Sequence, residues 1–268
     1  MSIKVGKIPY LNSVLFYYGL DKDPDVTTDL LVPRQLSGAA VEDAVDAGPV
    51  PLVTCWEIEE LYEPLGDFCI STRDKARSIL LYSKRPFDAL DGAAVGITNE
   101  TSTSVRLLKA LLHHHYRVSP EKFVHLDWPN NDAFLLIGDE ALIHRRGVKD
   151  YPHVADLGEV WNEWTGLPFV FAQWMVRRRL GADAKQALCD KLDASIEAGW
   201  REFDDVVEPK SHELNMTTAE MREYLEGFRF KMTDAERDAV ERFRQLDTAA
   251  ASGSGPTGAA RIDGKEIA

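Results

Sequence analysis

The amino-acid sequence predicts an α/β protein with two lobes and a ligand cleft between them. Strand-like and helix-like segments alternate as far as Val176, which is typical of mostly parallel sheets flanked by helices. This strand–helix pattern restarts near residue 92, and after Val176 it gives way to helices alone. The chain has 268 residues, and two lobes of about 100 residues each fit the usual size of domains.

The first part of the chain is expected to contain three strand–helix units. Asn12 or Ser13 is a plausible N-cap of the first helix, and Pro33 opens the second at the position that proline favours. Strands are predicted over residues 3–8, 25–32 and 45–50, and helices ending near Tyr18, starting at Pro33 and covering residues 56–61.

The middle of the chain repeats the pattern after a turn at Asp91-Gly92. The helix predicted here carries Val105, Leu108 and Leu112 on one face. Strands are predicted over residues 68–72, 77–83, 94–98, 134–137, 154–157 and 169–176, and the helix over residues 102–115.

The last part is predicted to be helical. Apolar residues from Leu188 to Phe203 form a continuous stripe at helical spacing. Thr217 with Glu220, and Thr233 with Glu236, have the spacing of capping boxes that begin two further helices. Residues 249–268 are rich in Ala, Gly and Ser, and they are predicted to form a flexible tail.

These elements predict a discontinuous lobe. Lobe one is expected to comprise residues 1–83 and 173–248, and lobe two residues 84–172. The two crossing strands then form a hinge, and a ligand lies in the cleft between the lobes.

The composition restricts the function and the location. A formal net charge of −13 argues against binding to nucleic acid or to an anionic membrane surface, although a local group of N–H donors still binds a small anion. The three cysteines have neither zinc nor redox spacing and are interpreted as reduced, buried thiols. No signal peptide or membrane span is recognisable, so a cytoplasmic location is expected; the oligomeric state is not indicated.

Two strand-to-helix turns, one in each expected lobe, concentrate hydroxyl and amide side chains. They cover residues 10–13 and 98–104. Free N–H groups at a helix N-terminus, together with such side chains, suit a carboxylate. Helix capping favours the same residue types, but four consecutive hydroxyl residues, 101–104, exceed what one cap needs.

Three further features are weaker. Gly48-Pro49 and Gly138-Asp139 each end a predicted strand, where an α/β sheet faces its ligand crevice, but a tight turn explains them equally well. Ser78 lies in an apolar strand, where a serine bonded to backbone is common.

Other candidates are better explained without a ligand. Residues 113–115 are three histidines, which point in different directions on a helix and cannot converge on one metal ion. Trp161 and Trp164 are able to stack on a ring-shaped ligand, but such pairs are more often core. No nucleophile elbow, phosphate-binding glycine loop or dinucleotide fingerprint is present, so spacing alone predicts a two-lobed anion binder.

Several segments together resemble one family, the chorismate dehydratases of the futalosine route to menaquinone. The resemblance covers roughly residues 3–247, in the expected order, and differs slightly at Pro9 and Ser13. The segments are VGKIPYLN (5–12), DAGPV (46–50) followed by Leu52-Val53, RSILL (77–81), TSTSV (101–105), LLIGD (135–139) and DLGEVWNEWTGLPFVFA (156–172).

The resemblance implies a periplasmic-binding-protein-like fold of type II and the dehydration of chorismate to 3-[(1-carboxyvinyl)oxy]benzoate, without a metal or organic cofactor. It places Asn12 and Ser78 in the cleft, where they would hold the substrate and align its C3–H bond. The implied substrate-binding residues are Tyr10, Pro49, Thr101, Ser102, Thr103, Gly138 and Asp139.

Alternatives stay open at this point. The proton acceptor is either the substrate's own enolpyruvyl carboxylate or Asp139, because the segments contain no obvious histidine, lysine or glutamate base. A non-catalytic solute-binding protein would share the fold, and so would the sister enzyme that makes dihydroxynaphthoate, although a different opening motif is expected there.

Overall fold

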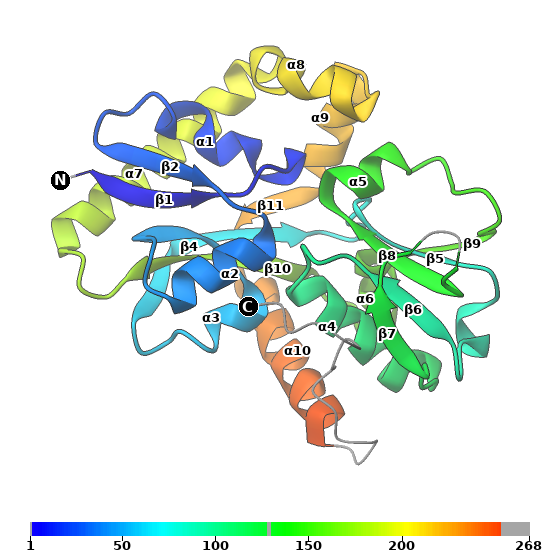
Figure 1. Cartoon of the computed structure of the whole chain (residues 1–268). Coiled ribbons are helices and arrows are strands. Elements are labelled where there is room, and N and C mark those ends of the chain that lie inside the picture. Colours follow the sequence, from blue (N-terminus) through cyan, green and yellow to red (C-terminus); the bar gives the residue numbers. More distant parts are fainter. Residues whose placement is uncertain (1, 128–129, 253–268) are drawn as a thin grey trace.

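The structure, a computed structural model that describes residues 2–127 and 130–252, contains two separate β-sheets (Figure 1). The first sheet runs, from edge to edge, through β11 (Phe228–Lys231), β4 (Tyr62–Thr72), β10 (Phe169–Arg177), β3 (Ala47–Pro51), β1 (Ile3–Lys7) and β2 (Val26–Leu30). The second runs through β7 (Lys122–His125), β6 (Ala94–Ile97), β8 (Ala133–Ile137), β5 (Ile79–Ser83) and β9 (His153–Asp156). The expected two-lobed α/β fold is confirmed.

Both sheets are mixed, whereas mostly parallel sheets were expected. β1 pairs in parallel with β2 and β3, as strand–helix–strand units require. β10 is antiparallel to β3 and β4, and β5 is antiparallel to β8 and β9. β5 and β10 are the first strands that the chain forms after it passes from one lobe to the other. No helix of the same lobe links them to a preceding strand of their sheet, so nothing requires them to run parallel to it.

The passages between the lobes lie a few residues earlier than the expected boundaries. β5 pairs with β8 and β9, so Ile79–Ser83 belongs to the second sheet. β10 pairs with β4 from Phe169 and with β3 from Ala172, so residues 169–172 belong to the first sheet. The chain therefore crosses between residues 72 and 79 and returns between residues 156 and 169, because hydrogen bonding assigns each strand to its sheet.

Helices flank each sheet (Figure 1). In lobe one, Ser195 joins two of them: its hydroxyl accepts from the Gly19 N–H at 2.8 Å and donates to the Leu15 carbonyl at 3.1 Å. The helices of lobe one are α1 (Val14–Leu20), preceded by the 3₁₀ turn η1 (Leu11–Ser13), α2 (Pro33–Val41), α3 (Leu52–Cys55), α7 (Ala182–Arg201), α8 (Phe203–Leu214) and α9 (Thr218–Glu226). Lobe two carries η2 (Phe87–Ala89), α4 (Thr103–Ala110), the π-helical η3 (Leu111–Tyr116), α5 (Gly138–Ile143) and α6 (Leu157–Thr165).

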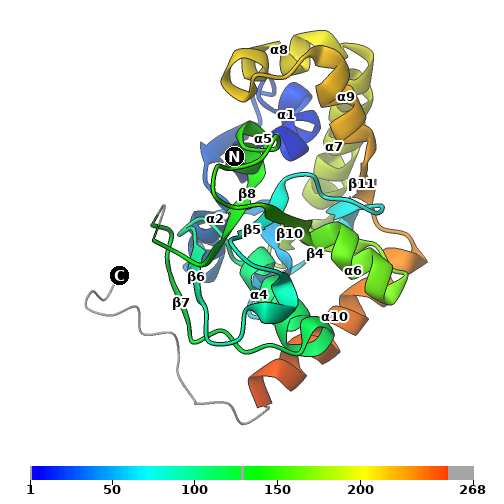
Figure 2. The ribbon, with the colours of Figure 1, turned by 90° about the vertical axis from the view of Figure 1, so that its right-hand side faces the viewer.

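The last helix, α10 (Asp234–Ser252), connects the two lobes from below (Figures 1 and 2). Near its start, the buried Glu236 accepts from the Thr233 N–H at 2.9 Å and from Arg229 at 2.8 Å. Towards its end, Asp247 receives two hydrogen bonds from Arg106 of α4. The helix continues to Ser252, past the expected start of the tail at residue 249, and residues 253–268 of that predicted tail lie outside the described residues.

One local prediction was wrong, and two strands were missed. Residues 56–61 form turns, because the helix follows β3 immediately as Leu52–Cys55. β7 and β11 were not predicted; each has only four residues and lies at a sheet edge, where half the backbone pairing is missing and the sequence pattern is short. By contrast, the capping box of Thr217 and Glu220 is confirmed by reciprocal hydrogen bonds of 3.2 and 2.8 Å.

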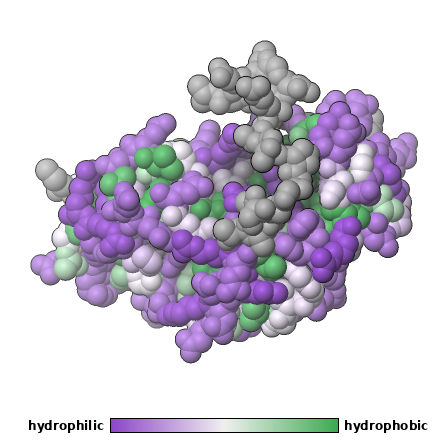
Figure 3. Space-filling model, turned by 90° about the horizontal axis from the view of Figure 1, so that it is seen from below, coloured by the Kyte–Doolittle hydropathy of each residue, from purple (hydrophilic) through white to green (hydrophobic). Residues whose placement is uncertain are grey.

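The surface seen from below is mainly hydrophilic, with apolar residues in small separate areas (Figure 3). No helix of the described part is both long and apolar enough to cross a membrane. The cysteines are free; Cys55 and Cys69 are buried, and Cys189 is half-buried.

Candidate active site

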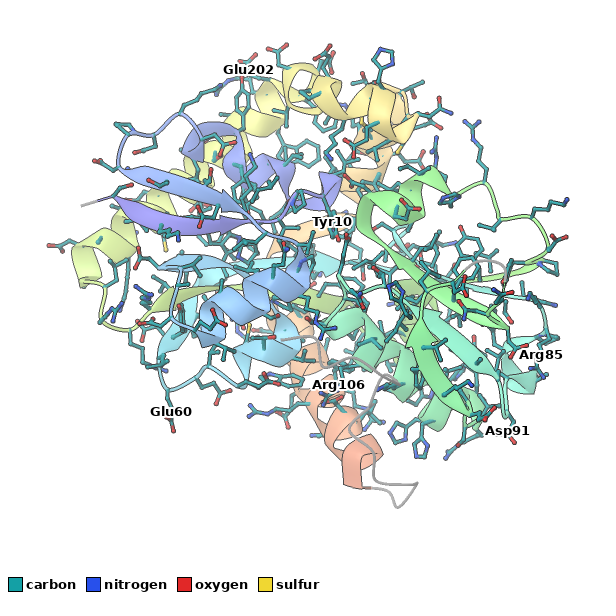
Figure 4. All side chains as sticks on the ribbon, viewed as in Figure 1. Tyr10, Glu60, Arg85, Asp91, Arg106 and Glu202 are labelled. Carbon is teal, nitrogen blue, oxygen red and sulfur yellow. The ribbon has the colours of Figure 1, made fainter. Side chains whose placement is uncertain are left out.

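A pocket lies between the two lobes. Small-molecule sites occur preferentially at such interfaces between domains. Both lobes contribute to its wall, and Figure 4 shows Tyr10 at this junction. The lining residues are Ile8, Tyr10, Asn12, Pro33, Pro51, Ile70, Phe171 and Ala172 from the first lobe, and Ile79, Thr101, Ser102, Thr103, Ser104, Ile137 and Gly138 from the second.

Three side-chain oxygens of this pocket are buried without a hydrogen-bond partner among the described residues. They are Asn12 Oδ1, Thr101 Oγ1 and Thr103 Oγ1. The exposed fractions of the three residues are 8%, 6% and 4%. A buried polar group without a partner costs about 1–3 kcal/mol, so these atoms are suited to pair with a polar ligand.

The first turn presents Asn12 to the pocket because Ser13 holds the backbone. The Ser13 hydroxyl lies within hydrogen-bonding distance of the Ile8 and Tyr10 carbonyls, at 2.8 and 2.9 Å. Ser13 occupies the N-cap position of α1, but its side chain caps no N–H group. Asn12 does not cap the helix either, since its Oδ1 has no partner there. The expected N-cap position at Ser13 is therefore confirmed, but neither side chain makes the capping hydrogen bond.

The second turn brings the N-terminus of α4 to the pocket. Ser102 is the N-cap residue, but its side chain bonds to no N–H of the helix. The first N–H groups of α4 have no partner within the helix, and the helix dipole adds partial positive charge there. Thr101 to Ser104 line the pocket at this point, so the expected cluster of hydroxyl and N–H donors lies together.

Direct contacts across the cleft close the pocket. The Tyr10 hydroxyl donates to the Glu100 carboxylate, and the Arg34 N–H donates to the Glu100 carbonyl at 3.1 Å. Burial, with the adjacent Glu100 carboxylate, raises the pKa of Tyr10 well above its ordinary value, so Tyr10 is a hydrogen-bond donor at neutral pH. Glu100 was not predicted as a site residue, because it contacts its partners only when the lobes meet.

The Ser102 hydroxyl differs from its two threonine neighbours because Ser37 contacts it at 3.3 Å. Ser37 also lies 3.1 Å from the Pro33 carbonyl and 2.8 Å from the Thr54 hydroxyl. A carbonyl only accepts, so the single Ser37 hydrogen points to Pro33 and the Ser37 oxygen accepts from Thr54 and Ser102. The donors left for a ligand are therefore the hydroxyls of Thr101 and Thr103.

Gly138 lines the pocket in a conformation that requires glycine. Its φ is +58°, and a Cβ atom would lie 2.7 Å from the Tyr10 ring. Its N–H donates to the Ser78 carbonyl at 2.8 Å. The absence of a side chain at Gly138 therefore lets the backbone of the second lobe approach the Tyr10 ring closely.

Asp139 lies beside the pocket and is not part of its wall. One carboxylate oxygen accepts from the Leu11 N–H at 2.8 Å, and the other accepts from Lys210 at 2.7 Å. Burial raises the pKa of the Asp139 carboxyl, while Lys210 and the Leu11 N–H act in the opposite direction.

Ser78 and Pro49 are also absent from the pocket wall. Ser78 is fully buried, and its hydroxyl bonds to the Tyr224 hydroxyl at 2.7 Å. Pro49 lies inside β3 opposite Trp174, and Pro51, at the end of that strand, forms the wall instead. The strand extends one residue further than expected, so the proline at the crevice is the next one along.

Sequence reasoning missed the apolar part of the wall. Ile8, Ile70 and Phe171 line the pocket from strands or strand ends, but in the sequence they are indistinguishable from core residues. Ile8 alone had a signal, since it ends the predicted strand 3–8; Ile70 lies in the middle of its predicted strand and Phe171 near the start of its own.

The metal and stacking candidates have other roles. His114 contacts the Leu246 carbonyl at 3.0 Å, and no group of three His, Cys, Asp or Glu residues suited to a metal ion occurs within residues 2–127 and 130–252. Trp161 is fully buried, and its indole N–H donates to the Pro168 carbonyl at 2.9 Å, which confirms it as core.

The two sheets and the pocket between them define a two-lobed fold of the periplasmic-binding-protein type II. The Candida albicans CA3427 gene product, described as having the generic periplasmic binding protein structural fold, is similar with a TM-score of 0.63 at 13% identity, over 96% of this chain and 92% of that chain.

The chain belongs to the menaquinone biosynthesis family, whose model matches residues 3–249. It is 29% identical over 202 residues to the chorismate dehydratase of Thermus thermophilus, covering 68% of this chain and 72% of that protein. A shorter segment of 47 residues is 45% identical to the 1,4-dihydroxy-6-naphtoate synthase of Streptomyces coelicolor, covering 18% of this chain and 17% of that protein.

Proposed function

We propose that the protein is a lyase that converts chorismate to 3-[(1-carboxyvinyl)oxy]benzoate and water in menaquinone biosynthesis. The observation that carries this proposal is the pocket in which Asn12, Thr101 and Thr103 meet from two lobes with unpaired oxygens. Family membership and the Thermus relative supply the choice of substrate.

The pocket suits the two carboxylates of chorismate. We assign one carboxylate to the N-terminus of α4, with Thr101 and Thr103 as hydroxyl donors. We assign the other, or the charge that develops during the reaction, to the Asn12 Nδ2 group, which is the donor of this amide. The unpartnered Oδ1 of Asn12 is left to accept from a substrate hydroxyl. Ser102, whose hydrogen is directed to Ser37, is left to accept from a substrate hydroxyl.

The reaction breaks two bonds, C3–H and C4–O, and removes their H and OH as water. The C3–H bond breaks, and its electron pair is delocalised through the ring diene into the ring carboxylate, where N–H donors stabilise the charge. That pair then forms the C3–C4 double bond as the C4 hydroxyl leaves. The ring becomes aromatic, and the proton removed from C3 balances the departing hydroxide as water.

We propose that the enolpyruvyl carboxylate of the substrate accepts the C3 proton. Among the described pocket-lining residues there is no His, Lys, Asp or Glu. Asp139, the alternative acceptor, has each carboxylate oxygen bonded to a protein donor. This occupancy favours the substrate carboxylate.

The remaining sequence-predicted residues keep proposed roles of different kinds. Tyr10 and Gly138 shape the pocket and bring the lobes together. Ser78 is proposed to support the site indirectly, because its carbonyl accepts from the N–H of the pocket residue Gly138. Pro49 is proposed to act indirectly as well, as part of the strand that ends at Pro51. Replacing Ser78 with Ala is expected to cost less than replacing Asn12.

Incubating the purified protein with chorismate tests the proposal. Stoichiometric formation of the benzoate, followed by chromatography and mass spectrometry, is expected at a rate that chelators leave unchanged. Binding of chorismate without turnover would indicate a solute-binding protein instead. Turnover of a cyclic futalosine in place of chorismate would indicate the sister synthase.

A further inference from the structure

A largely buried ion pair outside the pocket joins the two lobes. Asp139 lies in the first turn of α5 in lobe two, and Lys210 lies in α8 of lobe one. Their charged groups are 2.7 Å apart, and the side chains are only 9% and 19% exposed. Lys210 also contacts Glu213 at 3.0 Å, but that side chain is 53% exposed.

The same carboxylate holds the first turn of lobe one. Its second oxygen accepts from the Leu11 N–H at 2.8 Å. Leu11 separates Tyr10 from Asn12, and both of these neighbours line the pocket. The peptide between Tyr10 and Leu11 is therefore fixed by a residue of the opposite lobe.

Lys210 stabilises the ionised Asp139 carboxylate that accepts from the Leu11 N–H. Burial disfavours the ionised carboxyl, and it raises the pKa of Asp139. Removing one partner of a buried ion pair leaves a charge without compensation, which is strongly destabilising. Without Lys210, the carboxylate would protonate or turn towards water, and in either case the Leu11 N–H would lose its charged acceptor.

We propose that Asp139 and Lys210 form a clasp that positions the Tyr10–Asn12 turn across the cleft, with Asp139 a positioning residue and not the proton acceptor. Closure of the lobes and placement of the Asn12 amide are then linked by one carboxylate. For its activity readout this inference rests on the proposed function, but its structural readout is independent of it.

The test compares Asp139→Asn, Lys210→Met and the double variant with the unaltered protein. The readouts are hydrogen exchange of the Leu11 amide, measured by NMR, affinity for 3-[(1-carboxyvinyl)oxy]benzoate, and kcat and KM with chorismate. Faster Leu11 exchange is expected in both single variants. A loss of kcat of about tenfold or more is expected, because small displacements of reacting groups are costly.

The pattern among variants separates a clasp from a base. The double variant is expected to be no worse than Asp139→Asn, since both partners act through one contact. Lys210→Arg, which keeps the positive charge, should retain most of the activity and most of the protection of the Leu11 amide from exchange. Glu213→Gln is the matched control: it removes the exposed contact of Lys210, which does not reach the turn, and should leave all readouts unchanged.

Unchanged Leu11 exchange in Asp139→Asn would overturn the clasp. Complete loss of turnover in Asp139→Asn, with nearly normal turnover in Lys210→Met and intact Leu11 protection in both, would make Asp139 the proton acceptor. If the unaltered protein does not turn over chorismate, the proposed function fails, and Leu11 exchange in the same variants still decides the clasp.

Discussion

Buried polar residues of two kinds lie in and beside the interlobe pocket. Asn12, Thr101 and Thr103 have oxygens without partners, whereas Ser78 and Asp139 have protein partners already. The first kind is suited to pair with a ligand, and the second holds the backbone that presents it. Sequence reasoning grouped all five residues, because an amide, hydroxyl or carboxyl near the end of a predicted strand or helix has the same pattern in either role.

Asn12→Asp separates ligand binding from structure at the first turn. The change keeps the size of the side chain but replaces an amide donor with an anion. Turnover of chorismate is expected to fall by about 10²-fold or more, the usual scale for losing a donor to developing charge. Circular dichroism and the melting temperature are the folding controls. A folded variant with near-normal kcat would remove Asn12 from the site.

Thr103→Val and Thr101→Val test the carboxylate donors. Valine keeps the shape and removes the hydroxyl, so each variant should bind the benzoate product about tenfold more weakly, which corresponds to about 1.4 kcal/mol. Ser102→Ala is the matched control, expected to change affinity much less because Ser37 already takes its hydrogen. Calorimetric titration measures all three. A larger loss in Ser102→Ala than in the threonine variants would reverse the assignment.

At the scale of elements, the sequence predicted most strands and helices of the sheets but few of their contacts. The turns at residues 10–13 and 98–104 were found because helix N-termini have a local signature. Pro51, Phe171, Glu100 and Lys210 were not found, because their roles arise only from strand pairing and from the meeting of the lobes. β3 ends at Pro51, one residue later than predicted, so Pro51 and not Pro49 lines the pocket.

Glu236 anchors the start of α10 and gives this element a pH-dependent stability. Burial alone would raise the pKa of its carboxyl, but hydrogen bonds from Thr233 and the Arg229 guanidinium bring it below the ordinary value of 4.5. A depressed pKa in the folded state stabilises the protein above pH 4.5, and this contribution is lost as the pH falls through the folded-state pKa.

Glu236→Gln is therefore expected to destabilise the protein at pH 7 by about 2 kcal/mol, the scale of hydrogen bonds to a charged group. The difference from the unaltered protein should shrink below pH 4.5. Urea unfolding at several pH values measures it. A difference that stays constant into the acidic range would show that the carboxylate charge is not responsible.

At the scale of the whole molecule, contacts between the lobes assemble the pocket. Glu100 receives the Tyr10 hydroxyl and the Arg34 N–H, and α10 connects both lobes from below (Figure 1). Closure excludes water from the region where charge develops during the proposed reaction, which strengthens every hydrogen bond there.

Glu100→Ala should weaken closure without altering the groups assigned to the substrate carboxylates. KM for chorismate is expected to rise by about tenfold, the effect of losing one hydrogen bond to a charged acceptor, with a smaller change in kcat. Small-angle scattering of the ligand-free variant should show a larger radius of gyration. Glu100→Gln keeps an acceptor for Tyr10 and is the control. Equal compactness and equal KM in Glu100→Ala would mean that this contact does not hold the lobes together.

The central claim is that the interlobe pocket removes the C3 proton and the C4 hydroxyl of chorismate. It is tested most directly with chorismate that carries deuterium at C3. The account predicts that 3-[(1-carboxyvinyl)oxy]benzoate forms without ring deuterium, and that turnover is slower than with unlabelled substrate if C–H cleavage limits the rate. Recovery of unchanged labelled chorismate, release of pyruvate, or a product that retains the ring deuterium would contradict it.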